Sequence, residues 1–249
     1  MIAETSRPHR VALFITCLGD LFYPQVGEAT VRLLRRAGLT VGFPRRQTCC
    51  GQPAYNSGFH HVTRQLAEHF VNVFDNAEYI VTPFGSCAAL VKNEYPHLFD
   101  DDPKLRERVE ALGRRTYELT SFLVDVLGMD DFGATFAARA TYHDGCHAYR
   151  GLGIYDAPRR LLAHVRGLDL FEMGSPVWCC GFGGTFSVRM PDTSGAILEE
   201  KIRRIQATGA DVVVSTEFGC MMNIAGGLAR RGLPLRVIHL ASILAGDVR

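Results

Sequence analysis

The sequence predicts an α/β protein of two tandem, pseudo-symmetric Rossmann-like units with mainly parallel sheets. The first observation behind this prediction is a repeated cysteine pattern: Cys-x31-Cys-Cys-Gly-x35-Cys runs from Cys17 to Cys87, and Cys-x32-Cys-Cys-Gly-x38-Cys runs from Cys146 to Cys220. The second is the alternation, in each copy, of short apolar runs with amphipathic stretches, which is typical of parallel βαβ units. Because an internal repeat indicates related units, we expect one cysteine-rich repeat over residues 1–128 and another over residues 129–249.

In the first half, the continuous apolar run Arg10–Thr16 predicts a strand that is buried on both faces and leads to Cys17. Gly19 is expected to open a turn after this strand. The other predicted elements are strands over residues 40–43 and 79–82 and helices over residues 24–37, 59–75, 103–115 and 120–127, followed by a linker over residues 128–133. Cysteines follow the strand ends, which is the edge where loops of a parallel sheet converge on a ligand.

The second half repeats this order of elements. Predicted strands cover residues 140–143, 168–172, 211–215 and 236–239, and predicted helices cover residues 157–165, 193–208 and a segment from residue 240 onward. In the helix over residues 193–208, Ile197, Leu198, Ile202 and Ile205 form an apolar stripe. Cys146 again follows the first strand of the repeat, so the two halves are expected to place their cysteines alike.

Charge and composition exclude several function classes. The 27 Lys and Arg residues nearly balance the 26 Asp and Glu residues, so no overall field favours nucleic acid or an anionic membrane. The apolar run after Arg10 is short and lacks a cleavage site, which favours a strand over a signal peptide. No apolar run reaches the roughly 18 residues of a membrane span, so we expect no transmembrane segment. Eight cysteines in 249 residues are too sparse for a secreted disulfide scaffold, which favours a cytoplasmic protein with reduced thiols.

The cysteines are the predicted metal ligands, four in each half. They are Cys17, Cys49, Cys50 and Cys87 in the first half and Cys146, Cys179, Cys180 and Cys220 in the second. Four convergent thiolates can hold an iron–sulfur cluster or a tetrahedral zinc ion. Side chains of adjacent cysteines tend to diverge, which suits separate iron atoms of one cluster better than a single ion. Zinc in one half remains an alternative, and so does a set of buried free thiols.

Glycines after the cysteine pairs are the predicted cofactor-binding positions. Gly51, Gly181, Gly183 and Gly184 let the backbone approach closely and direct amide N–H groups at sulfur. No G-x-G-x-x-G pattern follows a strand, so a dinucleotide site is not expected.

Polar residues around Cys146 are the candidate catalytic groups. An imidazole and a guanidinium could hold a carboxylate substrate while a proton moves, which indicates His147 and Arg150. His143 and Asp144 lie in the same segment, but His143 could simply end the strand and cap a turn.

Five motifs together carry a resemblance to a known family. They are residues 49–58 (CCGQPAYNSG), 85–89 (GSCAA), 143–147 (HDGCH), 179–187 (CCGFGGTFS) and 219–223 (GCMMN). The chain resembles the cysteine-rich CCG domain family from about residue 10 to residue 245. Members of this family include a subunit of heterodisulfide reductase and the iron–sulfur subunit of glycolate oxidase, and the motifs are most similar to those of its lactate-utilisation branch.

The resemblance implies an iron–sulfur component, with clusters of the 4Fe-4S type, of a three-protein system that oxidises L-lactate to pyruvate. Its implied partners are a larger iron–sulfur subunit and a third small subunit, and its implied substrate is a small 2-hydroxy acid. The broader family often ends each repeat in Cys-x-x-Cys, whereas Leu90 and Asn223 occupy these places here. Four ligands per half suffice for an ordinary four-iron cluster. A thiol–disulfide reductase of the heterodisulfide type and a zinc-bearing scaffold subunit remain alternatives.

Overall fold

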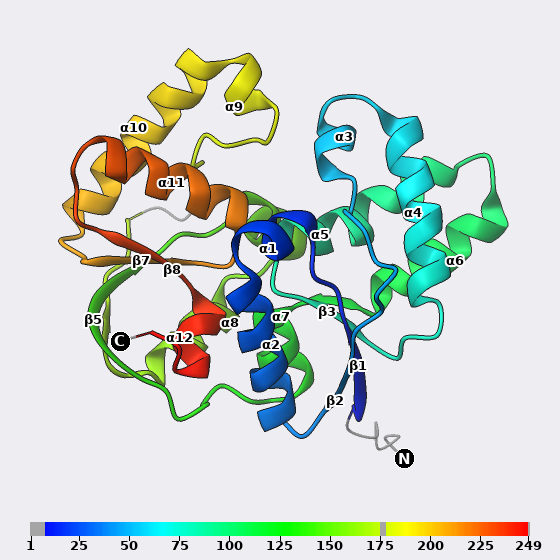
Figure 1. Cartoon of the computed structure of the whole chain (residues 1–249), viewed down its shortest axis with the longest axis horizontal. Helices are drawn as coiled ribbons and strands as arrows, with labels where there is room; N and C mark the ends of the chain where they lie inside the picture. Colours follow the sequence, from blue (N-terminus) through cyan, green and yellow to red (C-terminus); the bar gives the residue numbers. More distant parts are fainter. Residues whose placement is uncertain (1–7, 175–177, 249) are drawn as a thin grey trace.

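The computed structural model describes residues 8–174 and 178–248 and contains two four-stranded, entirely parallel sheets (Figure 1). The strand orders are β2-β1-β3-β4 and β6-β5-β7-β8, so both sheets place their first strand in the same internal position. The predicted α/β class with two tandem Rossmann-like units is confirmed.

The first sheet forms from short, apolar strands connected by helices. Its strands are β1 (Arg10–Leu13), β2 (Thr40–Gly42), β3 (Ile80–Thr82) and β4 (Thr116–Glu118). Its helices are α1 (Cys17–Phe22), α2 (Pro24–Arg36), α3 (Gln52–Asn56), α4 (His60–Phe74), α5 (Gly85–Ala89), η1 (Leu90–Glu94), η2 (Tyr95–Phe99), α6 (Pro103–Arg114), α7 (Leu119–Ser121) and η3 (Phe122–Val126). Asp102 caps the N-terminus of α6, because its carboxylate accepts the Leu105 N–H at 3.1 Å.

The second sheet has the same connectivity. Its strands are β5 (Thr135–Tyr142), β6 (Arg166–Leu170), β7 (Val212–Ser215) and β8 (Arg236–His239). Its helices are η4 (His147–Gly151), α8 (Asp156–Ala163), α9 (Phe186–Arg189), α10 (Pro191–Ala207), α11 (Phe218–Arg230) and α12 (Leu240–Ala245). Residues 128–134 carry neither helix nor strand and lead from the first sheet to the second.

One sequence prediction about local structure is wrong, and one long helix was not predicted. Gly19 does not open a turn but lies buried within α1, where an added Cβ would be 2.6 Å from Phe84 Cζ. The segment after β7, which is not among the predicted elements, is the 13-residue helix α11. In both places glycines that signal turns in the sequence are required for close packing of a helix against its neighbours.

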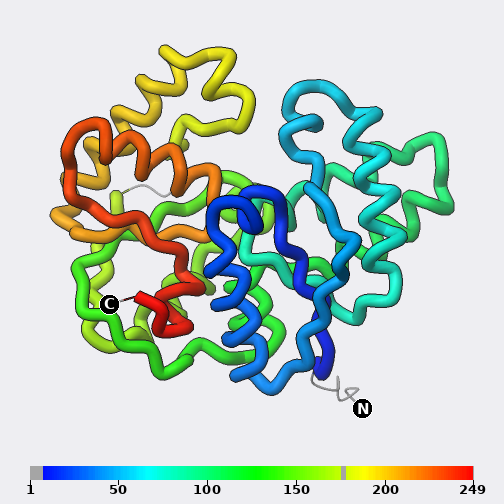
Figure 2. Tube along the Cα trace, in the orientation of Figure 1, coloured from blue at the N-terminus to red at the C-terminus, as the bar shows by residue number. Residues whose placement is uncertain are grey.

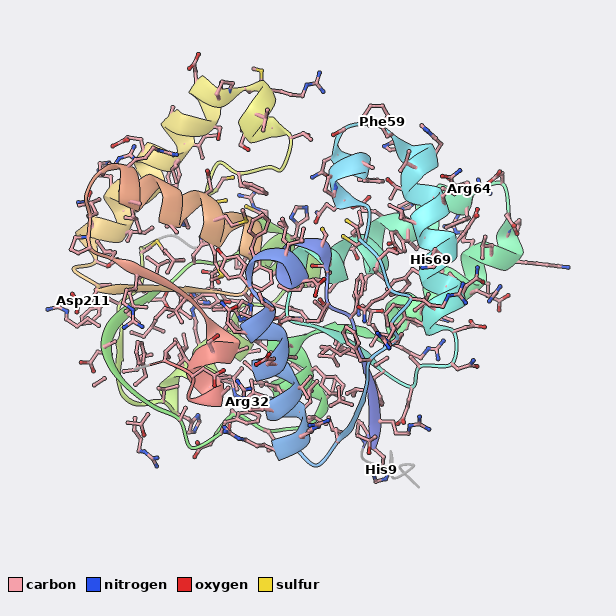
Figure 3. The ribbon with its side chains drawn as sticks, in the orientation of Figure 1. His9, Arg32, Phe59, Arg64, His69 and Asp211 are labelled. Atoms are coloured by element: carbon pink, nitrogen blue, oxygen red, sulfur yellow. The ribbon has the colours of Figure 1, made fainter. Side chains whose placement is uncertain are left out.

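The terminal helix of each half packs against the other half. Figure 2 shows α12, near the C-terminus, beside α2, near the N-terminus, and the two elements are in contact. Arg36 on α2 donates to the backbone carbonyl of Ala245 at 3.1 Å, and Arg32, labelled on α2 in Figure 3, pairs with Asp247. In return, α7 and η3 of the first half contact α8 of the second. The halves therefore exchange their last helices.

Every helix within the described ranges is too short or too polar to cross a membrane.

Candidate metal centres

The first cysteine set assembles at the carboxyl edge of the first sheet. Cys17 begins α1 directly after β1, and Cys87 lies in α5 directly after β3, while the adjacent pair Cys49 and Cys50 lies between β2 and α3. The Sγ atoms of Cys17 and Cys49 are 3.3 Å apart, as are those of Cys50 and Cys87. The structure thus brings together the four cysteines of this half.

The second set assembles in the same way. Cys146 precedes η4 after β5, Cys220 lies in α11 after β7, and the pair Cys179 and Cys180 follows β6. Cys180 Sγ lies 3.0 Å from Cys220 Sγ, and the thiol of Cys146 donates to the sulfur of Cys179. All eight cysteines are free, and each predicted group of four converges.

Backbone amides point at the sulfurs of both pairs. The Gly51 N–H donates to Cys49 Sγ at 3.4 Å, and the Gly181 N–H donates to Cys179 Sγ at 3.3 Å. Both glycines have φ near +90°, at 90° and 84°, a conformation that places these amides and that residues with a Cβ rarely adopt. The Phe182 N–H donates to Cys180 Sγ at 3.4 Å, and no glycine signal marks this donor in the sequence.

Gly183 and Gly184 differ from Gly51 and Gly181 in their position relative to the cysteine sulfurs. They form the turn into α9, where the Gly184 carbonyl accepts the Ser187 hydroxyl at 2.8 Å. Their φ angles are also positive, 53° and 65°. Their role therefore concerns the path of the loop after the cysteine pair.

The thiols within each set share protons unequally. A hydrogen bond from the Cys17 thiol, with others from Cys50 and the Gly51 amide, holds the pKa of Cys49 well below its ordinary value. Hydrogen bonding to Cys49 and then to Cys87 raises the pKa of Cys50. Four thiolates this close repel one another, so a full set of thiolates requires a cation among them.

The second set repeats this pattern and has a buried lysine beside it. A hydrogen bond from Cys146 lowers the pKa of Cys179, and hydrogen bonding to Cys179 and Cys220 raises the pKa of Cys180. Lys201 lies on α10, and its side chain is 1% exposed. Its ammonium contacts Met173 Sδ at 3.7 Å. The second set thus has a buried cationic group in its surroundings.

Lys201 is the site residue that sequence reasoning missed. It occupies the i+3 position after Leu198 and precedes Ile202, so it falls on the apolar stripe of α10. Its position on that stripe could have indicated a special role, because a lysine is almost never fully buried in a protein core unless it has a partner.

The candidate catalytic residues line a cavity of about 320 Å³ between the two halves. His147, Arg150 and Cys146 contribute to one wall, and residues after the first-half cysteines contribute to the other. Gln52 lies 3.0 Å from His147, measured between the two Nε2 atoms, so an amide donor from Gln52 makes this ring nitrogen the acceptor. Desolvation lowers the pKa of His147, and Glu94 and Cys179 oppose this shift.

The other two polar residues of the HDGCH motif are not in the cavity lining. Asp144 forms a bidentate ion pair with Arg159, with both N–O distances at 2.9 Å, and it is buried. His143 is fully buried, and neither of its ring nitrogens has a hydrogen-bond partner among the described residues.

A further buried carboxyl lies between the halves. Glu217 is 4% exposed, and its side chain packs so closely that a Cβ on Gly145 would lie 2.1 Å from its Cγ. A Cβ on Gly85 would lie 2.5 Å from its Oε1. Burial raises the pKa of Glu217 to about 8, against hydrogen bonds from Ser86. The glycines before Cys87 and Cys146 are thus required by this contact.

Comparison with known proteins gives the family. The cysteine-rich domain termed CCG matches residues 11–92 and 140–225. Lactate utilization protein A of Geobacillus kaustophilus (strain HTA426) is 52% identical over 235 residues, which cover 94% of this chain and 98% of that protein. Lactate utilization protein A of Exiguobacterium sp. (strain ATCC BAA-1283 / AT1b) is 51% identical over 241 residues, which cover 96% and 98%.

The two CCG matches include all eight cysteines, and the resemblance drawn from the five motifs is confirmed. The chain belongs to the CCG cysteine-rich domain family, with lactate utilization protein A among its relatives.

Proposed function

We propose that this chain is an iron–sulfur protein that transfers electrons during the oxidation of L-lactate to pyruvate, as one component of a three-protein lactate utilisation system in the cytoplasm. The observation that carries the proposal is the convergence of two sets of four cysteines, with Sγ–Sγ contacts of 3.0–3.3 Å. The names of the relatives indicate lactate as the substrate, and the convergent thiols indicate a bound redox cofactor.

The residues present fit a metal–sulfur group. Free thiols from three separate segments meet in each half, and amides of Gly51, Gly181 and Phe182 donate to their sulfurs. Amide donors of this kind stabilise the sulfurs of iron–sulfur clusters. The buried ammonium of Lys201 also fits an anionic neighbour, because a buried charge is costly unless an opposite charge accompanies it. A 4Fe-4S cluster in each set would supply one-electron transfer when bound.

The cavity beside Cys146 is the proposed site for the 2-hydroxy acid. Oxidation of lactate to pyruvate removes two electrons and two protons, so a group must accept a proton. The lowered pKa of His147 keeps its ring neutral near pH 7, and its Nε2 is placed as an acceptor. Arg150 from the same wall would hold the carboxylate of the substrate. A cavity of about 320 Å³ suits a molecule of this size.

Metal analysis after anaerobic purification tests the cofactor. Two four-iron clusters predict about eight iron and about eight acid-labile sulfide per chain, with broad absorption near about 400 nm. Stoichiometric zinc without sulfide or colour would instead support the scaffold alternative and contradict the proposal.

Reconstitution with the larger iron–sulfur subunit and the third small subunit tests the reaction. Lactate should reduce an added dye only when all three proteins are present. Cys180→Ser should abolish this activity, and Cys49→Ser should reduce it less if the second half holds the more reactive centre. Arg150→Met should raise KM for lactate more than it lowers kcat, because it removes binding of the carboxylate. Full activity of Cys180→Ser would contradict the cluster mechanism.

A further inference from the structure

The second cysteine set has a buried histidine beside it that no described group satisfies. His143 is 0% exposed, and both Nδ1 and Nε2 lack a hydrogen-bond partner among the described residues. A buried imidazole without partners has lost the hydrogen bonds that water would make to it, and nothing in the described protein replaces them. Its backbone is held firmly, since the His143 N–H donates to the Val214 carbonyl at 2.8 Å and its own carbonyl accepts the Ser215 hydroxyl at 3.1 Å.

The ring is directed at the sulfurs of this set. One ring nitrogen of His143 and the Sγ atoms of Cys180 and Cys220 all lie within 4.8 Å of one another. Imidazole nitrogen and thiolate sulfur are both ligands for iron and zinc, so the three atoms form a compact donor set. Within the described residues this is the one group of three or more histidine, cysteine or acidic side chains found at such spacing.

The first half shows that the fold does not require a histidine here. Phe14 stands three residues before Cys17, as His143 stands three residues before Cys146. The backbone positions match as well, because the Phe14 N–H donates to the Val81 carbonyl at 2.8 Å, on the neighbouring strand β3.

A second pair of matched positions, on the helices α4 and α10, also differs between the two halves. Thr63 and Ser194 are the fourth residues of α4 and α10, and their hydroxyls donate to the carbonyls of Gly51 and Gly181. Seven residues further along, α4 has Phe70 and α10 has Lys201.

In the first half, Phe14 and Phe70 pack edge to face, with ring centroids 5.1 Å apart. An apolar pair in one half is thus replaced by His143 and Lys201 in the other. At both matched positions a phenylalanine of the first half corresponds to a polar, nitrogen-bearing side chain in the second. This indicates that the two sites differ in chemistry and not only in packing.

We propose that His143 supplies a nitrogen ligand to the metal group of the second cysteine set, so that this site is a mixed histidine and cysteine site and the first is an all-cysteine site. The inference rests on the proposed function only in that metal binding is assumed. A neutral imidazole is the form that binds a metal through a ring nitrogen. If the imidazole takes the place of one of the four thiolates, the second site carries less negative charge than the all-cysteine site and has the higher reduction potential.

Pulsed electron paramagnetic resonance of the anaerobically purified, partly reduced chain tests the ligand directly. Protein labelled with 15N only in histidine should show a strong 15N hyperfine coupling. His143→Phe, which reproduces the matched residue of the first half, should lose this coupling, and His147→Gln should retain it. Absence of the coupling in labelled wild-type protein, or its persistence in His143→Phe, would overturn the proposal.

Cobalt binding provides a second test, which requires neither an iron–sulfur cluster nor a correctly folded variant. Co²⁺ added to the metal-free, reduced chain should give ligand-field bands of a site with nitrogen and sulfur donors together with bands of an all-sulfur site. A spectrum that contains only the bands of all-sulfur sites would contradict the nitrogen ligand. Iron and sulfide contents on the same preparation separate the two questions: their absence contradicts the proposed function, whereas the cobalt spectra decide the role of His143.

Discussion

Lys201 is buried near the cysteines of the second set, and its charge would affect the reduction potential of a metal group bound there. Lys201 has a lowered pKa because of burial, and the cysteines of its own half, led by Cys220 and Cys180, act in the opposite direction. Deprotonated thiolates therefore favour the charged ammonium, and the ammonium favours added electrons on the metal group.

Removing the charge of Lys201 should shift the reduction potential of the second site and leave that of the first site unchanged. We expect Lys201→Met to lower the reduction potential of the second site, because a unit charge about 10 Å away contributes about 1–2 kcal/mol at an effective dielectric constant of about 20. This corresponds to about 40–90 mV for a one-electron couple. A redox titration followed by paramagnetic resonance measures it. Lys92→Met, on η1 of the first half, is the matched control, and a shift of equal size there would contradict the assignment.

Glu118 at the end of β4 gives a pH dependence that does not involve the cysteines. Burial raises the pKa of Glu118 to about 7, with a small contribution from Asp125, while hydrogen bonds from Thr120 and Ser121 oppose the shift. The charge of Glu118 in turn contributes to the raised pKa of the buried Glu217. Since the folded pKa of Glu118 lies above the unfolded value, the stabilisation is complete below about pH 4.5 and is lost as the pH rises through about 7.

The variant Glu118→Gln should remove this loss. Between pH 5 and pH 8, the free energy of unfolding of the wild type should fall by about 2–3 kcal/mol more than that of the variant. Urea titrations at the two pH values measure this difference. Glu107→Gln, at an exposed position of α6, should follow the wild type, and an identical pH dependence of Glu118→Gln would refute the prediction.

At the scale of elements, glycine acts as a packing residue in helices. Gly19 in α1 lies against Phe84 and Phe218, and Gly227 in α11 lies against Leu198 and Ile202. A helix with glycine loses about 1 kcal/mol relative to one with alanine. The close approach that glycine permits offsets this loss through contact area.

A matched pair of glycine variants separates these two effects. Gly19→Ala should destabilise the chain by about 1–3 kcal/mol, because the new Cβ would be 2.6 Å from Phe84 Cζ and 3.0 Å from Phe218 Cε2. Gly195→Ala in α10 meets nothing within 4 Å and should stabilise it by about 0.5–1 kcal/mol. Thermal or urea unfolding of both variants gives the sign of each change, and stabilisation by Gly19→Ala would contradict the packing account.

Much of the element order follows from local pattern, and its failures have a common cause. Buried strands such as β3 and β7 are runs of apolar residues, so their positions were predictable. The helices α1 and α11 were not predictable, because their glycines also fit turns and only the partner surface distinguishes the two cases. Convergence of the cysteines followed from their spacing, but the exchange of His143 and Lys201 for phenylalanines required knowledge of which helix residue lies behind which strand.

At the scale of the molecule, neither half has all of its own covering helices. Helix α2, whose buried residues include Val26, Ala29 and Leu33, contacts α12, whose residues are almost fully buried. Residues 1–128 alone would leave α2 without this contact and would expose apolar surface of α2 to water.

We therefore expect a fragment of residues 1–128 not to fold cooperatively. Circular dichroism during urea titration should show a broad transition for the fragment and a sharp one for the full chain, and limited proteolysis should cleave the fragment faster. A sharp transition and full protection in the fragment would contradict the dependence on α12.

The exchange of terminal helices also sets the order of events during synthesis. Helix α2 leaves the ribosome early, whereas α12 follows only after every strand of the second sheet has been made. The first half therefore stays open while the second is being translated. Closure of the molecule is a late event, and a premature stop just before Leu240 leaves the earliest long helix without its cover.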